Sequence, residues 1–251
     1  MKLGAQLYTV RDYLKNEDDI FQSLKKIKAI GYDIIQLSGL GEFRPEWLKD
    51  KADEIGLKIC VTHNSLERIT HDTDNLIKEH ILYDAKYIGL GFHDLSTIEK
   101  CDDFIKNISV ATEKFFDAGL KFVYHNHAVE FNRLKKKQFI IDYIAENTDK
   151  EKFGFLVDLY WVQFGGYSPV KFLEKYSDRI DVVHFKDLKI ENLVQPTFAE
   201  IFEGNMDYKD IYRVCLKHDV KYAVVEQDTC LDDPFKSLEI SYNNIKRNNL
   251  F

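Results

Sequence analysis

The amino-acid sequence predicts a single parallel (β/α)₈ barrel that spans residues 1–251. Eight short apolar segments, of the kind that forms strands buried on both faces, alternate with helical segments at roughly 30 residues per unit. A chain of 251 residues has the usual size of one such barrel. Eight units that fill the chain favour a closed barrel over an open doubly wound sheet, and no GxGxxG fingerprint supports the open form.

The predicted strands are recognised by short apolar runs whose two sides are both hydrophobic. In chain order they are LGAQLY, DIIQL, KICVTH, AKYIGLG, KFVYHNH, GFLVD, DVVHFK and AVVEQ. The segments between them have helical periodicity. The first of these segments carries one apolar stripe, formed by Ile20, Phe21, Leu24, Ile27 and Ile30.

Glycines mark several of the joins between a helix and the next strand. The amphipathic segments before Gly31, Gly56 and Gly119 each stop at the glycine, and an apolar run begins one or two residues later. A glycine at this position closes a helix in the left-handed conformation at little steric cost. We therefore expect these three residues to adopt positive φ angles.

The composition excludes several classes of protein. A net charge of −7 argues against a nucleic-acid-binding surface, which needs a basic face. The four cysteines are scattered without a CxxC pair, as expected of reduced thiols. The amino-terminal segment lacks the apolar core of a signal peptide, and no run approaches the ~18 apolar residues of a membrane span. We therefore expect a cytoplasmic protein that binds neither nucleic acid nor membrane.

Polar side chains collect at the carboxyl ends of the predicted strands, where barrels of this class carry their active sites. Each of the last four strands places a metal-ligand type near its end. These are Glu130, His125 or His127 for the fifth strand, then Asp158, His184 and Glu226. Carboxylates combined with imidazole suit one divalent ion such as Mn²⁺, Co²⁺, Zn²⁺ or Mg²⁺.

The chain resembles the sugar isomerase/epimerase superfamily, whose barrels are similar to xylose isomerase and endonuclease IV. The motifs that carry the resemblance are GAQLYTVRD, THNSLER, YHNHAVEF, VDLYWVQFGG, VVHFKD, FEGNMDY and VVEQDT. The resemblance implies one divalent metal ion held by Asp158, His184 and Glu226. Many relatives have a glutamate where this chain has His125, so we expect Glu130 to be the fourth ligand, with His125 and His127 as the alternatives.

The resemblance also implies proton removal from a carbon next to a carbonyl, with an enediolate stabilised by the ion. We expect the proton-transfer groups to be His125, His127, Lys186 and Glu226. We expect contacts to the substrate from Gln6, His63, Trp161 and Gln227. Among these, Lys186 lies two residues after His184, which places both on one side of a strand.

The predicted activity is that of an isomerase or epimerase acting on an unphosphorylated sugar, keto-sugar or inositol-type polyol. The loop after the last strand, QDTCLDDP, is acidic, whereas a phosphate site needs backbone N–H groups, glycine and basic residues. The alternatives are a lyase or dehydratase on a keto-sugar or inosose, a non-catalytic sugar-binding barrel, and a DNA repair nuclease. The sequence leaves the oligomeric state open, with a homodimer as one outcome.

Overall fold

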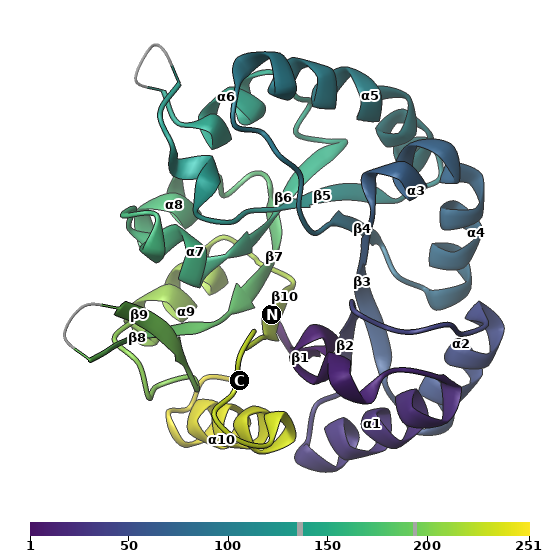
Figure 1. Ribbon diagram of the computed structural model, residues 1–251, viewed down its shortest axis with the longest axis vertical. Coiled ribbons are helices and arrows are strands. Elements are labelled where there is room, and N and C mark those ends of the chain that lie inside the picture. Colours follow the sequence, from purple (N-terminus) through teal and green to yellow (C-terminus); the bar gives the residue numbers. More distant parts are fainter. Residues whose placement is uncertain (135–137, 193–194) are drawn as a thin grey trace.

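The chain folds into a closed barrel of parallel strands surrounded by helices (Figure 1). The structure, a computed structural model, describes residues 1–134, 138–192 and 195–251. Within these ranges, neighbouring barrel strands pair in the order β1-β10-β7-β6-β5-β4-β3-β2, and β2 closes on β1. The barrel strands are β1 (Lys2–Gln6), β2 (Ile34–Leu37), β3 (Lys58–Asn64), β4 (Tyr87–Leu90), β5 (Lys121–His125), β6 (Phe153–Asp158), β7 (Ile180–Phe185) and β10 (Tyr222–Val225). The predicted (β/α)₈ fold is confirmed.

Helices cover the outside of the barrel (Figure 1). They are α1 (Glu17–Ile30), α2 (Pro45–Glu54), α3 (Leu66–His71), α4 (Thr73–Tyr83), α5 (Ile98–Asp117), α6 (Ile140–Glu146), α7 (Leu159–Phe164), α8 (Pro169–Lys175), α9 (Tyr208–Lys217) and α10 (Pro234–Arg247), with 3-10 turns η1 (Leu7–Tyr13) and η2 (Val129–Phe131). In α1, Asn16 caps the first turn, and the buried side chains of Ile20, Leu24 and Ile27 face the barrel. Among the described residues, no helix combines the length and the hydrophobicity needed to cross a membrane.

The three predicted helix-closing glycines all have positive φ angles. The values are +123° at Gly31, +71° at Gly56 and +77° at Gly119. Gly31 also has a steric reason, because a Cβ atom there would lie 2.5 Å from the ring of Tyr242 on α10. A side chain at Gly31 would therefore disturb both the helix end and the packing of α1 against α10.

The segment after β7, which the sequence analysis treated as a loop, contains an antiparallel pair. β8 (Asp187–Glu191) and β9 (Gln195–Ala199) pair outside the barrel. Both strands are five residues long with mixed polar and apolar side chains, so they lack the apolar run that identifies a barrel strand. The carboxylate of Asp187 anchors the segment that follows, because it accepts the backbone N–H groups of Phe202, Gly204 and Met206.

The barrel interior is built in layers. An apolar layer takes side chains from most of the strands: Ile34, Cys60, Val61, Tyr87, Val123, Leu156, Val182 and Val224. Alternate residues of a strand share a face, so the residue two positions further on lies in the next layer toward the carboxyl ends. That next layer is polar and consists of Gln6, Gln36, His63, His125, Asp158, His184 and Glu226. The apolar layer therefore forms the floor beneath a ring of polar side chains.

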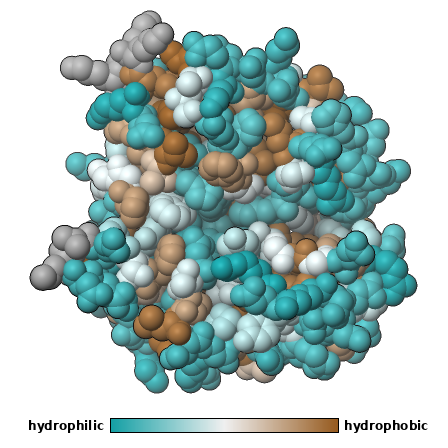
Figure 2. All heavy atoms as spheres, in the orientation of Figure 1, coloured by the Kyte–Doolittle hydropathy of each residue, from teal (hydrophilic) through white to brown (hydrophobic). Residues whose placement is uncertain are grey.

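The surface around this interior is mostly hydrophilic. Figure 2 shows charged and polar side chains over most of one face, with apolar residues confined to separate small patches. This distribution agrees with a charged fraction of 31%.

Acid should destabilise the fold partly through His80, a buried residue of α4. Its Nδ1 donates to the Leu76 carbonyl and its Nε2 contacts Thr62 Oγ1, and burial lowers the pKa of His80 to about 4. The unfolded chain binds this proton at higher pH, so the stability contributed by neutral His80 is present above about pH 6.5 and is lost toward pH 4. We expect wild type to lose about 3 kcal/mol more than His80→Gln over this interval. Urea unfolding at both pH values measures this, and equal losses in the two proteins would contradict it.

Candidate metal centre

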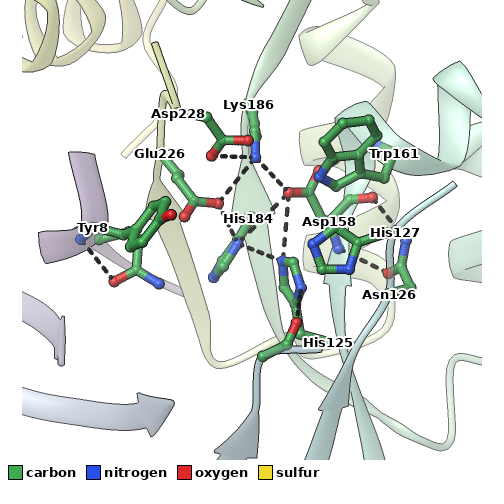
Figure 3. Close-up of polar contacts among 12 residues, drawn as sticks. Tyr8, His125, Asn126, His127, Asp158, Trp161, His184, Lys186, Glu226 and Asp228 are labelled. Carbon is green, nitrogen blue, oxygen red and sulfur yellow. Dashed lines mark hydrogen bonds and ion pairs between the residues drawn. The ribbon is translucent and has the colours of Figure 1, made fainter. Parts of the chain in front are cut away.

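Four buried side chains of metal-ligand type converge at the carboxyl ends of neighbouring strands (Figure 3). His125 ends β5, Asp158 ends β6, His184 lies near the end of β7, and Glu226 directly follows β10. One ligand atom from each lies within 4.8 Å of those of the other three. Two imidazoles and two carboxylates make a donor set that suits a borderline divalent ion.

Outer hydrogen bonds turn one nitrogen of each imidazole toward the centre of this group. His125 Nδ1 donates to the Gly91 carbonyl oxygen at 3.1 Å, which leaves Nε2 facing the group. His184 Nε2 donates to Gln36 Oε1 at 2.8 Å, which leaves Nδ1 2.9 Å from Glu226 Oε2. A carbonyl oxygen only accepts, so each outer bond identifies the outward nitrogen as the donor. The inward nitrogens can therefore bind a metal ion while the outer hydrogen bonds remain.

The charge on His184 depends on the carboxylates beside it. Burial alone would lower the pKa of His184, but Glu226 and Asp158 outweigh burial and raise the pKa to about 9. Without a metal ion the ring is therefore a cation near pH 7 that donates to Glu226. An ion bound by His184 Nδ1 would replace this proton, since metal binding requires the neutral imidazole.

The two carboxylates of the group are held ionised. Burial alone would raise the pKa of Asp158 and of Glu226, but Lys186 and the neighbouring histidines outweigh burial and hold both pKa values below their usual range. The group therefore contains two carboxylate charges at a buried position, and a divalent cation bound there would stabilise them.

Lys186 lies beside the group, with its side chain almost fully buried. Its Nζ is 2.7 Å from Asp228 Oδ1, 3.2 Å from Asp158 Oδ2 and 3.3 Å from Glu226 Oε2 (Figure 3). Burial alone would lower the pKa of Lys186, but these three carboxylates outweigh burial and raise it above its usual value. Lys186 is therefore a permanent ammonium ion at the edge of the candidate metal centre.

Aromatic rings enclose the other side of this ammonium group. The centroids of Phe198, Trp161 and Tyr160 lie 5.1, 5.3 and 5.8 Å from Lys186 Nζ. Phe198 comes from β9, so the antiparallel pair outside the barrel contributes directly to the surroundings of the site. Rings at this distance stabilise a cation and exclude water from it.

A cavity of about 410 Å³ opens above the candidate metal centre. Its lining includes two of the four residues of the group, His125 and Glu226, together with Lys186 and Asp228. The remaining lining residues are Tyr8, Ser38, His63, Asn64, Ser65, Gly91, Phe92 and His127. A cavity of this size, with convergent polar groups at its floor, is typical of a small-molecule site.

The structure places the predicted substrate contacts in different surroundings. His63 lines the cavity, and the other three residues do not. Gln6 is buried, with its side-chain oxygen accepting from Tyr8 N–H, and Gln227 donates to the Thr229 carbonyl. Trp161 packs against His127 and Lys186 instead of lining the cavity. Substrate contacts from Gln6, Trp161 and Gln227 therefore stay predictions.

Glu130 lies outside the four-residue group, although we expected it to be the fourth ligand. Its fully buried carboxylate accepts a hydrogen bond of 2.5 Å from the Tyr124 hydroxyl and one of 2.7 Å from His127 N–H. Both oxygens are thus occupied beside η2, and His125 stands in the group at the end of β5. In this structure Glu130 holds the loop that carries His127.

Replacing Glu130 with Gln is expected to leave metal affinity within about twofold of wild type. The amide can accept from His127 N–H and donate to the Tyr124 oxygen, so both contacts survive. His125→Ala, in contrast, is expected to weaken Co²⁺ binding by at least about 100-fold, because it removes a ligand. Titration with Co²⁺ followed by absorption spectroscopy compares the two variants. Equal affinity losses would show that Glu130 is a ligand in solution.

Two residues that support the site were not singled out from the sequence. Asp228 lies two positions after Glu226, as Lys186 does after His184, so the alternation of side chains along a strand was a usable signal. The amide of Asn126 brackets the backbone of Asp158, accepting its N–H at 3.0 Å and donating to its carbonyl at 3.3 Å. Nothing in the sequence distinguishes this role from that of any polar residue in a loop.

Comparisons with known proteins agree with this fold. Residues 24–229 match the sequence profile of the xylose isomerase-like TIM barrel family. The inosose dehydratase of Geobacillus kaustophilus is 27% identical over 148 residues, which cover 52% of this chain and 47% of that protein. The inosose dehydratase of Halalkalibacterium halodurans is 25% identical over 208 residues, covering 76% and 61%. The matches thus span about half to three-fifths of these relatives' own length.

Solved structures share the whole architecture at low sequence identity. A sugar phosphate isomerase/epimerase from Parabacteroides distasonis superposes with a TM-score of 0.82 at 23% identity, covering 98% of both chains. The D-allulose 3-epimerase from Methylomonas sp. gives a TM-score of 0.73 at 11% identity, covering 98% of this chain and 97% of its own. At these identities the likeness is one of fold.

Proposed function

Because this chain belongs to the xylose isomerase-like TIM barrel family, we propose that it is a divalent-metal enzyme that moves a proton next to the carbonyl of an unphosphorylated keto-sugar, inosose or related polyol. The observation that carries the proposal is the group of His125, Asp158, His184 and Glu226, with Lys186 beside it at the floor of a cavity. We propose these four residues as the metal ligands, with His125 in place of Glu130.

The group fits a divalent ion on chemical grounds. Its two inward imidazole nitrogens and two ionised carboxylates supply four donors, and their outer bonds run to Gly91 and Gln36. An ion held there would supply positive charge that stabilises negative charge developing on a substrate oxygen. The chain's own residues then have to bind the hydroxyl groups and transfer the proton.

We propose roles for two residues that both line the cavity. Burial lowers the pKa of His127 to about 3, so its ring is neutral near pH 7, and its unprotonated nitrogen can accept a hydrogen bond from a substrate hydroxyl group. Its buried Nδ1 has no hydrogen-bond partner among the described residues. Lys186 stays an ammonium ion and can donate a hydrogen bond to an oxygen that gains negative charge.

We propose isomerisation or epimerisation as the outcome, with dehydration as the second candidate. Loss of a hydroxyl group after proton removal needs stabilisation of the departing oxygen, and the Lys186 ammonium group, which lines the cavity, can donate a hydrogen bond to it. The two relatives described above are inosose dehydratases, and this similarity favours the second candidate.

Incubation with keto-sugars and inososes in deuterated water, followed by NMR, tests the proposal. We expect metal-dependent exchange of one carbon-bound proton, which EDTA abolishes and added Mn²⁺ or Co²⁺ restores. Exchange with the carbon skeleton intact supports epimerisation or isomerisation, and a product with a new C=C bond or its tautomer supports dehydration. Stoichiometric metal without exchange or turnover on any of these substrates would favour a non-catalytic sugar-binding barrel. Preference for a sugar phosphate, or nicking of abasic DNA, would overturn the proposed substrate class.

A further inference from the structure

Gln36 reaches across the barrel interior to a residue of the candidate metal centre. It lies on β2, and His184 lies on β7, separated by β1 and β10 in the strand order. Both side chains are completely buried, and the distance from His184 Nε2 to Gln36 Oε1 is 2.8 Å. The contact joins residues 148 positions apart in the chain, so it exists only in the closed barrel.

The nitrogen of the Gln36 amide, unlike its oxygen, makes no hydrogen bond to the described residues. This Nε2 atom is buried. An unpaired buried N–H group lowers stability, and an apolar residue of similar shape would avoid that cost. Among the described residues, the hydrogen bond to His184 is therefore the polar contact that the side chain of Gln36 makes at this position.

We infer that Gln36 is a positioning residue that fixes the orientation of His184 for metal binding, an inference that rests on the proposed function. Its oxygen can only accept, so it keeps the hydrogen on His184 Nε2 and leaves Nδ1 for the ion. The other imidazole of the group, His125, bonds to the backbone carbonyl of Gly91, which no side-chain change removes. Substitution of Gln36 can therefore alter the outer hydrogen bond of His184, whereas substitution of Gly91 leaves the carbonyl bonded to His125 in place.

Gln36→Met tests this role, because methionine has nearly the same length and cannot accept the hydrogen bond with comparable strength. We expect the Kd for Co²⁺ to rise about 10- to 100-fold, the range found when partners of ligating histidines are removed. The melting temperature of the metal-free protein is expected to change little, since the loss of the unpaired amide N–H offsets the loss of the hydrogen bond to His184. Gln36→Glu retains an acceptor and is expected to bind Co²⁺ at least as tightly as wild type.

Gln6→Met is the matched control. Gln6 lies opposite Gln36 on the neighbouring strand β1, is equally buried, and also has an unpaired Nε2, but its oxygen accepts from Tyr8 N–H instead of from a histidine. We expect its Kd for Co²⁺ to match wild type. Nitrogen-15 NMR of the imidazole rings in the metal-loaded proteins should show Nε2–H on His184 in wild type and in Gln36→Glu.

Three outcomes separate the inference from the proposed function. If wild type binds no Co²⁺, the metal site and the inference fail together. If wild type binds Co²⁺ and Gln36→Met binds it with the same Kd, the role of Gln36 is overturned while the metal site stands. If Gln36→Met and Gln36→Glu lose affinity equally, the effect comes from packing, and the positioning role is again overturned.

Discussion

Asp158→Asn is expected to lower kcat/KM by at least about 1,000-fold, equivalent to about 4 kcal/mol of transition-state stabilisation. Asp158 Oδ2 lies 3.5 Å from His125 Nε2 and 3.2 Å from Lys186 Nζ, so it occupies the centre of the charged group. The amide has the same shape but no charge, so the affinity for a divalent ion should fall with the activity. The other oxygen, Oδ1, caps α7 through Trp161 N–H, and asparagine is an equally good cap. The fold should therefore be retained.

Asp207→Asn provides the control for that experiment. Asp207 is an exposed residue that caps α9 through Asp210 N–H at 3.1 Å, so the same substitution is made at a helix start with no link to the metal group. We expect wild-type metal content and activity from it. Metal analysis, thermal melting and kinetics on both variants complete the test. Wild-type Co²⁺ affinity in Asp158→Asn would exclude Asp158 as a ligand.

Lys186→Met should lower turnover by about 100- to 1,000-fold, the range for loss of a donor that stabilises developing negative charge. The same change should make the folded protein more dependent on metal. Without the ammonium group, Asp158, Glu226 and Asp228 lose a cation that lies within 3.3 Å of each, and breaking a buried ion pair costs about 3–5 kcal/mol. A bound divalent ion offsets part of this repulsion. The rise in melting temperature on adding Co²⁺ should therefore exceed that of wild type.

Kinetics and melting curves, each with and without Co²⁺, measure both effects of Lys186→Met. Lys171→Met, on the exposed surface of α8, controls for the substitution itself and should behave as wild type in both measurements. Lys186→Gln is a second variant in case the methionine disturbs folding. Wild-type turnover in either metal-loaded Lys186 variant would remove Lys186 from the proposed chemistry.

The barrel could be predicted because its strands carry a signal that depends on local sequence alone. Segments such as GFLVD and DVVHFK are apolar on both sides, and the structure places β6 and β7 on them. The β8–β9 pair was missed because its residue pattern is mixed and Pro196 lies within β9. Its formation depends on tertiary contacts such as the Asp187 carboxylate, which local periodicity does not report.

The candidate site was predictable in its strand ends and less so in its details. Asp158, His184 and Glu226 lie at or beside strand ends, and the structure brings them together. His125 and Glu130 could not be distinguished as ligands from the sequence, because the position of the Glu130 carboxylate depends on its hydrogen bond from the Tyr124 hydroxyl. Local sequence does not report such a contact between side chains. The contact of Gln36 with His184 joins distant strands, so only the assembled barrel reveals it.

The closure of β1 on β10 has a consequence for how the protein matures. Glu226 directly follows β10, which pairs with β1 at one side and with β7 at the other. Until that last strand docks, the group contains at most three of its four ligands, and contacts so distant in sequence form slowly. Acquisition of a tightly held ion during refolding should therefore coincide with the final kinetic phase. An ion bound by all four ligands would then stabilise the completely folded barrel relative to partly folded states.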